Sequence, residues 1–270
     1  MSDIRLIQVP WYLGREHPDL SRGPSVLAEA IGGESIVVPG PEPRPVPNEV
    51  ADSFEVIRSV RSAVAETVAE GRFPLVLAVN CFTALGTVAG VGRAVGVVWF
   101  DAHGDFHTPD STTTGFLDGM GLAMLLGDGW HELRATVDGL RAVPAENAVL
   151  VHARDLEQTE AARLAASAVR RADADTLEDA LDDLAARIDA VYVHVDLDVI
   201  DPAVAHANVL SVEGGLDPEQ LERALTAVSN RFEIVAAALT AYDPSQDREK
   251  RVPEIAALLA RRLAPEKVAP

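Results

Sequence analysis

Short, wholly apolar segments recur along this chain, and longer amphipathic segments separate them. The apolar segments include PLVLAV at 74–79, VGVVWF at 95–100 and VYVHV at 191–195. Strands that are apolar throughout are typical of a parallel sheet covered on both faces, because the helices that connect parallel strands pack over those faces. The pattern therefore predicts an α/β fold in which one parallel sheet lies between two layers of helices.

The periodicity of the apolar residues assigns approximate bounds to these elements. We expect strands at residues 4–9, 34–38, 74–79, 95–100, 148–152, 191–195 and 232–239. We expect helices at residues 50–69, from 80 to about 91, and at 116–126, 157–170, 175–188, 218–229 and 247–263. The proline-rich stretch 39–48 is interpreted as a surface connection rather than a linker, so residues 1–270 are expected to form one domain.

The charge of the chain restricts its partners. Asp and Glu number 42 against 23 Lys and Arg, which gives a net charge of −19. Such a chain repels phosphate backbones and anionic membranes, so we expect a small cationic molecule as partner and neither nucleic acid nor a membrane. The single cysteine, Cys81, excludes an internal disulfide. With no signal-peptide pattern at the N-terminus and no long apolar run, we expect a cytoplasmic protein.

Acidic residues follow two of the apolar strands directly. Asp101, His103 and Asp105 come after one strand, and Asp196 and Asp198 come after another. Ligands of a parallel sheet bind beyond the carboxyl ends of its strands, and carboxylates crowded there repel one another unless a cation lies between them. One such cluster alone could be a solvated turn or a helix cap. Two clusters predict a metal centre, and four carboxylates with one imidazole suit an ion such as Mn²⁺.

The segments DAHGDFHTP and VDLDVIDP resemble the two most diagnostic motifs of the arginase, agmatinase and formimidoylglutamase family, the ureohydrolases. The segment 214–216, GGL, resembles a third family feature. The resemblance implies a three-layer α/β/α sandwich with a mainly parallel, about eight-stranded sheet. It also implies two Mn²⁺ ions bridged by Asp101 and Asp196, with His103 and Asp198 completing one site and Asp105 in the other. A trimeric or hexameric homo-oligomer is implied as well.

The resemblance also implies a reaction. Two ions held roughly 3.5 Å apart can share one water molecule and convert it to hydroxide near neutral pH. That hydroxide attacks the planar carbon of a guanidinium or amidine, and Asp105 is placed to hold the nucleophile and receive its proton. We therefore expect a metal-dependent hydrolase of a C–N bond in a guanidino or amidino compound, which releases urea or a related amide together with an amine.

The chain departs from the family at one metal position. The family's remaining ligand is a histidine that follows an aspartate, and here the pair is Asn80-Cys81. A cysteine thiolate is a softer ligand that favours Zn²⁺ or Fe²⁺ over Mn²⁺, so one site could be weak or empty. A small branch that resembles hydroxyarginine amidinohydrolases also has cysteine here. A buried, inert thiol is the alternative, and the position at a strand end favours a ligand role.

Three further departures affect the expected substrate site. Asp118 stands where many arginases carry a proton-shuttling histidine, and we expect it to be catalytic. Phe116 replaces an asparagine, and Ala241 replaces the glutamate that binds the guanidinium. Asp118, Glu213 or Asp243 could supply the missing charge, although each alone is as readily an ordinary surface or turn carboxylate. Further substrate contacts are expected from the following residues: His107, Thr114, Asp155 and Glu213. His194, inside its apolar strand, is expected to be a core histidine.

Two other functions remain open at this point. The loss of the family's histidine and glutamate would suit a catalytically degenerate subunit that binds or regulates. An amide deacetylase that shares the fold and an Asp-His-Asp metal set is the other alternative. The five retained hard ligands oppose the first alternative, and the paired aspartates of the second motif oppose the second.

Overall fold

The computed structural model describes residues 4–264. Within them, eight strands form one sheet in the order β2-β1-β3-β8-β7-β4-β5-β6, and every neighbouring pair is parallel. The strands are β1 (Ile4–Val9), β2 (Ser35–Val37), β3 (Phe73–Ala78), β4 (Gly96–Phe100), β5 (Ala148–Val151), β6 (Arg170–Ala172), β7 (Ala190–Asp196) and β8 (Glu233–Thr240). The α/β class and the eight-stranded sheet are confirmed.

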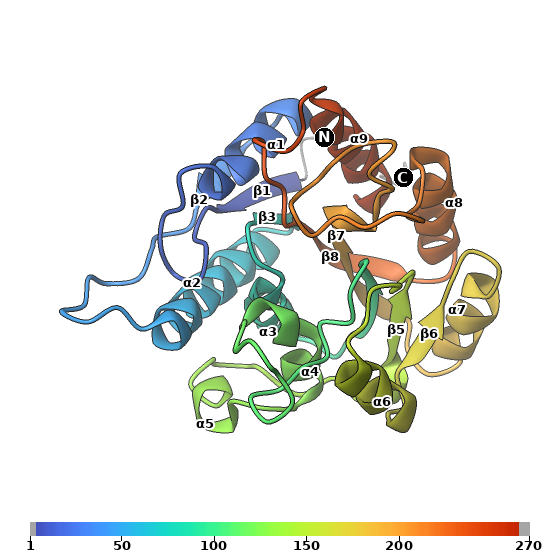
Figure 1. Ribbon diagram of the computed structural model, residues 1–270, viewed down its shortest axis with the longest axis horizontal. Helices are drawn as coiled ribbons and strands as arrows, with labels where there is room; N and C mark the ends of the chain where they lie inside the picture. Colours follow the sequence, from blue (N-terminus) through green and yellow to red (C-terminus); the bar gives the residue numbers. More distant parts are fainter. Residues whose placement is uncertain (1–3, 265–270) are drawn as a thin grey trace.

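Helices cover both faces of this sheet (Figure 1). One core cluster joins the sheet to α1, α7, α8 and α9, and the other joins it to α2, α3, α4 and α6. The helices are α1 (Gly23–Ile31), α2 (Glu49–Ala69), α3 (Ala84–Val91), α4 (Gly121–Leu126), α5 (His131–Arg134), α6 (Gln158–Ala166), α7 (Leu177–Ala185), α8 (Pro218–Ser229) and α9 (Arg251–Leu263). The result is the expected three-layer sandwich.

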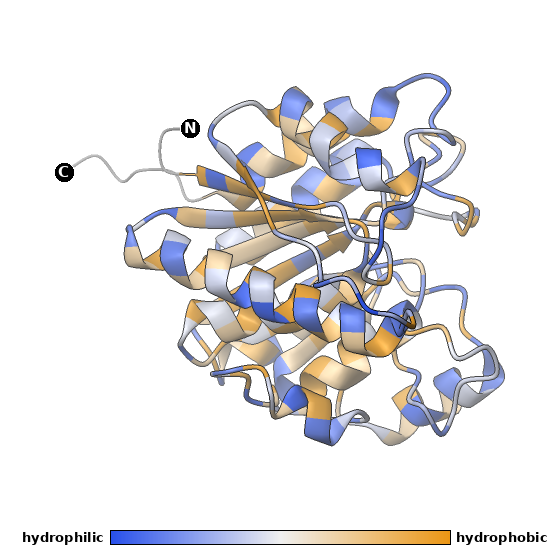
Figure 2. Cartoon of the chain, turned by 90° about the vertical axis from the view of Figure 1, so that its left-hand side faces the viewer, coloured by the Kyte–Doolittle hydropathy of each residue, from blue (hydrophilic) through white to orange (hydrophobic). Residues whose placement is uncertain are grey.

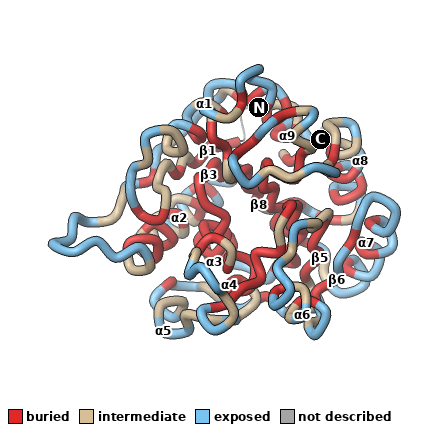
Figure 3. The backbone as a smooth tube through the Cα atoms, viewed as in Figure 1, coloured by how far each residue is buried: buried red, intermediate tan, exposed pale blue. Residues whose placement is uncertain are grey.

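Alternating residues of the central strands supply the two cores. In β4, Val98 and Phe100 belong to one cluster, whereas Val97 and Trp99 belong to the other. All four side chains are fully buried, and the apolar strands lie between helices with polar outer surfaces (Figures 2 and 3). Full burial of a side chain of this kind contributes roughly 1.5–3 kcal/mol, so the central strands form a rigid base for whatever lies at their ends.

The strand order brings four strand ends together. The chain leaves β3, forms β4, β5 and β6 on one side, and returns through β7 and β8 to fill the gap between β3 and β4. Phe100 of β4 pairs with Val195 of β7, and Asp196 pairs with Thr240 of β8. The residues that follow β3, β4, β7 and β8 therefore meet at one edge of the sheet, which is where an open α/β sheet binds its ligands.

The structure differs from the expected elements in four places. The expected helix 157–170 ends four residues early, at Ala166, and its last residue begins β6. β6 was not expected because it begins with two exposed arginines and has no apolar strand pattern. The expected helix 116–126 begins only at Gly121, after a 3₁₀ turn with a non-helical Gly119. Neither α1 nor the short α5 was expected. No helix in the described part of the chain has the length and apolar character needed to cross a membrane.

Candidate metal centre

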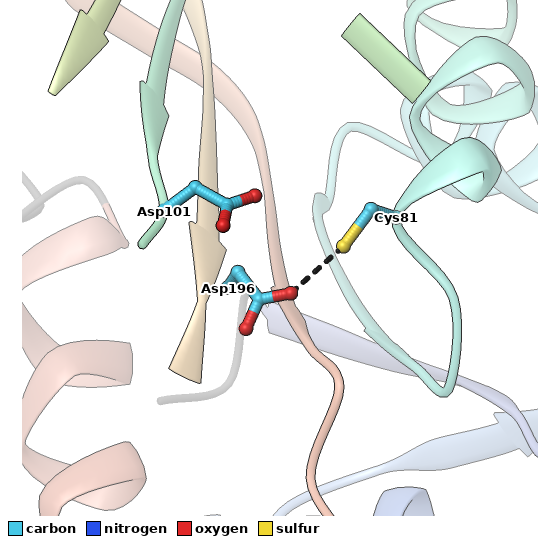
Figure 4. A group of neighbouring side chains, drawn as sticks. All are labelled: Cys81, Asp101 and Asp196. Carbon is cyan, nitrogen blue, oxygen red and sulfur yellow. Dashed lines mark hydrogen bonds between the residues drawn. The ribbon is translucent and has the colours of Figure 1, made fainter. Parts of the chain in front are cut away.

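Two groups of potential ligand atoms lie at the carboxyl edge of the sheet. One consists of Cys81, Asp101 and Asp196, and the other of Asp101, His103 and Asp198. Within each group the ligand atoms all lie within 4.8 Å of one another. Figure 4 shows the first group, with Asp101 and Asp196 at the ends of β4 and β7 and Cys81 reaching toward them from the turn after β3. Asp101 belongs to both groups, as a bridging ligand would.

Backbone N–H groups hold the carboxylates in place. The N–H of His103 donates to Asp101 Oδ1 (2.7 Å), and that of Asp198 donates to Asp196 Oδ1 (2.9 Å). The N–H of Ala102 donates to Asp198 Oδ1 (3.2 Å). The backbone after each strand thus fixes one oxygen of each carboxylate. Asp101, Asp196 and Asp198 are all at most 4% exposed, so these carboxylates lie inside the protein.

His103 lies between two of these carboxylates. Its Nδ1 atom is 3.3 Å from Asp101 Oδ1 and 3.3 Å from Asp198 Oδ2. Burial lowers the pKa of His103, but the hydrogen bonds and charges of Asp101 and Asp198 outweigh it and raise the pKa to about 12. A protonated imidazole at this position offsets part of the negative charge of the two carboxylates. A metal ion at the same position would take over that charge and leave a neutral imidazole as ligand.

Asp105 supplies the clearest sign that this site suits a cation. Its backbone has a φ of +47°, a left-handed conformation that a non-glycine residue rarely adopts. Its Oδ2 atom is buried and has no hydrogen-bond partner among the described residues. Burial, followed by repulsion from Asp101 and Asp118, raises the pKa of this carboxyl well above its usual range. A buried carboxylate oxygen without a donor is costly, and a divalent cation would remove that cost.

Cys81 completes this side of the centre. The thiol is 3% exposed and donates to Asp196 Oδ2, with 3.0 Å between sulfur and oxygen. Burial and the neighbouring charge of Asp196 raise the pKa of the Cys81 thiol, so the thiol form is favoured without a cation. A thiol, an imidazole and several carboxylates form a set of donors that fits divalent ions of hard to borderline character.

Asp118 lies beside the centre in an enclosed position. Asn80 Nδ2 donates to Asp118 Oδ2 (2.6 Å), and the N–H of Phe82 donates to Asp118 Oδ1 (3.2 Å). The N–H of Leu13 donates to Asn80 Oδ1 (2.8 Å), which fixes the amide so that its nitrogen points to Asp118. Burial raises the pKa of Asp118 to about 7, although the hydrogen bonds from Asn80 and Phe82 oppose this rise. The carboxyl can therefore exchange a proton near neutral pH.

Of the four expected substrate-binding residues, the structure places only Asp155 next to a ligand residue, while His107 is buried among other side chains. Asp155 Oδ2 is 4.0 Å from His103 Nε2, and His107 Nε2 is 3.7 Å from Glu157 Oε2. Thr114 and Glu213 are exposed on loops, and the structure shows no contact between either and the ligand groups. Asp243 accepts a hydrogen bond from the N–H of Ser245, as in an ordinary turn.

Arg154 connects three segments near these residues. Its Nη2 donates to the carbonyl groups of Asp198 (3.0 Å) and Val212 (2.9 Å), and its Nε donates to the carbonyl of Glu213 (3.2 Å). The guanidinium thus fixes the exposed loop that carries Glu213 against the backbone of Asp198.

Sequence reasoning missed three residues that support the centre. Glu160 of α6 is buried and accepts the N–H of Phe106 (2.9 Å), which holds the loop around Asp105. Asn208 donates to the carbonyl of Ala241 (2.9 Å). Thr240 lies 3.2 Å from Cys81 Sγ. Glu160 sits at an apolar position of an amphipathic helix, which is the one signal that could have identified it.

An α/β sandwich with a carboxylate-rich centre at the carboxyl edge of a parallel sheet is typical of a class of metal-dependent proteins. Comparisons with known proteins identify the family within this class. The model of the arginase family matches residues 2–267. The chain is 28% identical to the arginase of Bacillus subtilis, with 98% of both chains covered. It is 32% identical to the arginase of Brevibacillus brevis, over 78% of this chain and 74% of that one. The arginase structure from Bacillus caldovelox superposes with a TM-score of 0.86 at 27% identity and full coverage of both chains. The chain belongs to the arginase family.

Proposed function

We propose that this protein is a metal-dependent hydrolase that cleaves a C–N bond of a guanidino or amidino compound and releases urea or a urea-like product. The observation that carries the proposal is the buried, unpartnered Oδ2 of Asp105 beside two ligand groups that share Asp101. Membership of the arginase family supports the same reaction, because the relatives reported above are arginases.

The ligand groups and the family resemblance suggest which residues would hold two divalent ions. Asp101, His103 and Asp198 would hold one ion, and Cys81, Asp101 and Asp196 would hold the other. We propose Asp105, whose buried Oδ2 has no partner among the described residues, as a further ligand beside Cys81. We propose Mn²⁺ for the site of hard ligands and weaker Mn²⁺ binding at the site of Cys81. Two bound ions would make water a nucleophile near neutral pH and would polarise the carbon under attack.

The protein's own groups would then position substrate and move protons. Asp105 is buried beside the ligand groups with one free oxygen, so it can accept a proton from the attacking water. Asp118, whose pKa of about 7 lies near the ambient pH, can return a proton to the departing amine. The residues at the rim, His107, Thr114, Asp155 and Glu213, are proposed to contact the remainder of the substrate.

The substrate is proposed to differ from plain L-arginine. Ala241 supplies no carboxylate for a guanidinium, and Phe116 supplies no polar contact to an amino acid end. Loss of one charge-assisted bond costs roughly 1.5–3 kcal/mol, which is about one to two decades of affinity. A less basic compound such as an N-hydroxyguanidine avoids part of that cost, and Asp118 is proposed as the buried carboxylate that contacts it.

A panel of guanidino compounds, assayed for urea-type products after Mn²⁺ loading, tests the proposal. We expect a modified guanidine to be hydrolysed at least tenfold more efficiently than L-arginine, as the cost above implies. Arginine hydrolysis at the efficiency of an ordinary arginase would contradict our interpretation of Ala241 and Phe116. No hydrolysis of any compound while both metals are bound would instead support a degenerate binding subunit.

A further inference from the structure

A buried chain of hydrogen bonds leads from the core of the sheet to Cys81. Tyr192 Oη lies 2.8 Å from His194 Nδ1, and His194 Nε2 lies 3.2 Å from Thr240 Oγ1. Thr240 Oγ1 in turn lies 3.2 Å from Cys81 Sγ. Tyr192, His194 and Thr240 have no exposed surface. None of these three residues belongs to the ligand groups described above.

The direction of every bond in this chain follows from the number of hydrogens available. The thiol has one hydrogen and donates it to Asp196 Oδ2 at 3.0 Å, so in its contact with Thr240 the sulfur must accept. Thr240 then gives its only hydroxyl hydrogen to the sulfur and must accept from His194 Nε2. A neutral imidazole carries one N–H, so His194 Nδ1 accepts the hydroxyl hydrogen of Tyr192.

The imidazole cannot easily leave this arrangement. The ring of His194 stacks on Trp99 with 3.6 Å between ring centroids and 10° between the planes. Trp99 Nε1 donates to Asp101 Oδ2 (3.0 Å), so the same stacked pair supports a second member of the ligand group. Among residues 4–264, the carbonyl of Val195 is a competing acceptor near the Thr240 hydroxyl, at the longer distance of 3.5 Å.

We propose that Thr240 and His194 are positioning residues that adapt this metal centre to a sulfur ligand, an inference that rests on the metal-binding part of the proposed function. The sulfur already accepts a hydrogen bond from Thr240, and a metal-bound sulfur has no hydrogen to give and can only accept. If the centre held a metal ion, the Cys81 thiol would release its proton to solvent, and Thr240, which already donates to the sulfur, would remain its donor. Hydrogen bonds from groups behind a metal ligand fix its orientation and adjust its strength.

Cobalt(II) provides a direct optical signal for the sulfur ligand, because a cobalt–thiolate bond absorbs in the near ultraviolet by charge transfer. We expect this band in the Co²⁺-loaded protein and expect Cys81→Ser to abolish it. In Thr240→Val, which removes the hydroxyl and keeps the shape, the band should shift and a chelator should remove Co²⁺ roughly 10–100-fold more easily. Thr240→Ser, which keeps the hydroxyl, should behave like the unmodified protein.

Two further variants separate this effect from general damage to the core. Thr87→Val removes an equally buried hydroxyl in α3 that bonds only to the carbonyl of Thr83, so it should leave the band unchanged. Tyr192→Phe removes the far end of the chain and should shift the band in the same direction by a smaller amount. If Thr240→Val fails to fold, the Tyr192→Phe comparison still decides the question.

The possible outcomes separate this inference from the proposed function. A Co²⁺–sulfur band that Thr240→Val and Tyr192→Phe leave unchanged would overturn the inference, as would the lack of any band in the unmodified protein. A band that responds as expected in a protein without hydrolytic activity would support the positioning role and count against the proposed reaction.

Discussion

Cys81 is the residue at which this chain departs most clearly from a dinuclear manganese centre. The thiol is buried against Asp196 and is the one soft donor among hard ones. We predict that Cys81→His raises the number of Mn²⁺ ions bound per chain, because imidazole is a better ligand than sulfur for this ion. Isothermal titration with Mn²⁺, together with metal analysis after dialysis, measures the change.

A matched substitution provides the control for this prediction. Cys81→Ala removes the sulfur without adding a nitrogen, so it should lower the affinity of the weaker site for Zn²⁺ and should not increase Mn²⁺ binding. Equal Mn²⁺ number and affinity in the His variant and the unmodified protein would show that Cys81 is a packing residue.

Asp118 permits a sharper test of catalysis. We predict that Asp118→Asn lowers turnover by about 10²–10⁴-fold and leaves metal content nearly unchanged, because the amide keeps the size but cannot transfer a proton. Asp175→Asn changes an exposed carboxylate in the turn before α7 and should have no effect. Steady-state rates and metal analysis of both variants check the prediction. A parallel loss of metal and activity in Asp118→Asn would assign this carboxylate to metal binding instead.

At the scale of elements, the loop that carries Glu213 depends on one side chain. Arg154 donates to the carbonyl groups of Asp198, Val212 and Glu213. We predict that Arg154→Lys, which cannot reach all three acceptors, destabilises the protein by roughly 1–3 kcal/mol and exposes residues 208–216 to proteolysis. Arg171→Lys alters an exposed arginine that makes only a 3.3 Å bond to the carbonyl of Ala153 and serves as the control. Limited proteolysis with mass spectrometry distinguishes the two variants.

Elements with strong periodicity could be predicted from the sequence, and short polar ones could not. The buried strands β3, β4 and β7 lie where their apolar runs indicated. β6 is a three-residue edge strand that begins with two arginines, so only its pairing with β5 defines it. α4 begins late because the preceding residues form a 3₁₀ turn around Gly119, and the local composition does not reveal that geometry.

The same distinction applies to the candidate site. Asp101, His103, Asp196 and Asp198 could be singled out because strand ends and spacing determine where they lie. The contacts of Glu160 with Phe106 and of Thr240 with Cys81 join residues that are more than fifty positions apart in the chain. Such contacts depend on helix placement and strand order, and no local pattern in the sequence encodes them.

At the scale of the whole molecule, the acidic centre should make the metal-free protein sensitive to pH. The folded-state pKa of Asp118 is about 7 against 3.8 for an ordinary aspartate, and that of His103 is about 12 against 6.5. Between pH 3.8 and about 7, the folded chain keeps a proton on Asp118 that the unfolded chain has lost. Between pH 6.5 and about 12, the same holds for His103. The stability of the metal-free protein therefore falls as pH rises through these two intervals. We predict a lower melting temperature at about pH 8 than at about pH 6 in the presence of a chelator.

Metal binding should counteract this loss of stability at higher pH. Divalent ions compete with protons for the same groups, so the gain in melting temperature on adding Mn²⁺ should be larger at about pH 8 than at about pH 6. Differential scanning calorimetry with and without Mn²⁺ gives all four values. A metal-free protein whose stability increases with pH over this interval would contradict the raised pKa values of Asp118 and His103.

Assembly is the remaining prediction for the whole molecule. The family resemblance implies trimers or hexamers, and the residues after Asp247, including α9, could take part in the interface. We predict an oligomer of one of these sizes at micromolar concentration, measured by light scattering coupled to size-exclusion chromatography. A monomer under those conditions would refute the prediction.

The strand order also determines when during folding the centre can exist. Its ligands follow β3, β4 and β7, and β8 lies between β3 and β7, with Leu75 beside Ala237 and Val195 beside Leu239. Strand pairings between residues so distant in the chain form slowly, because the chain loses the entropy of closing a long loop before the new contacts stabilise it. The group of Asp101, His103 and Asp198 comes from the neighbouring strands β4 and β7 and does not require β8. Cys81 follows β3, on the other side of β8, so the group that contains it comes together only after β8 has entered the sheet. The two halves of the centre would thus form in a fixed order, with the sulfur-containing half last.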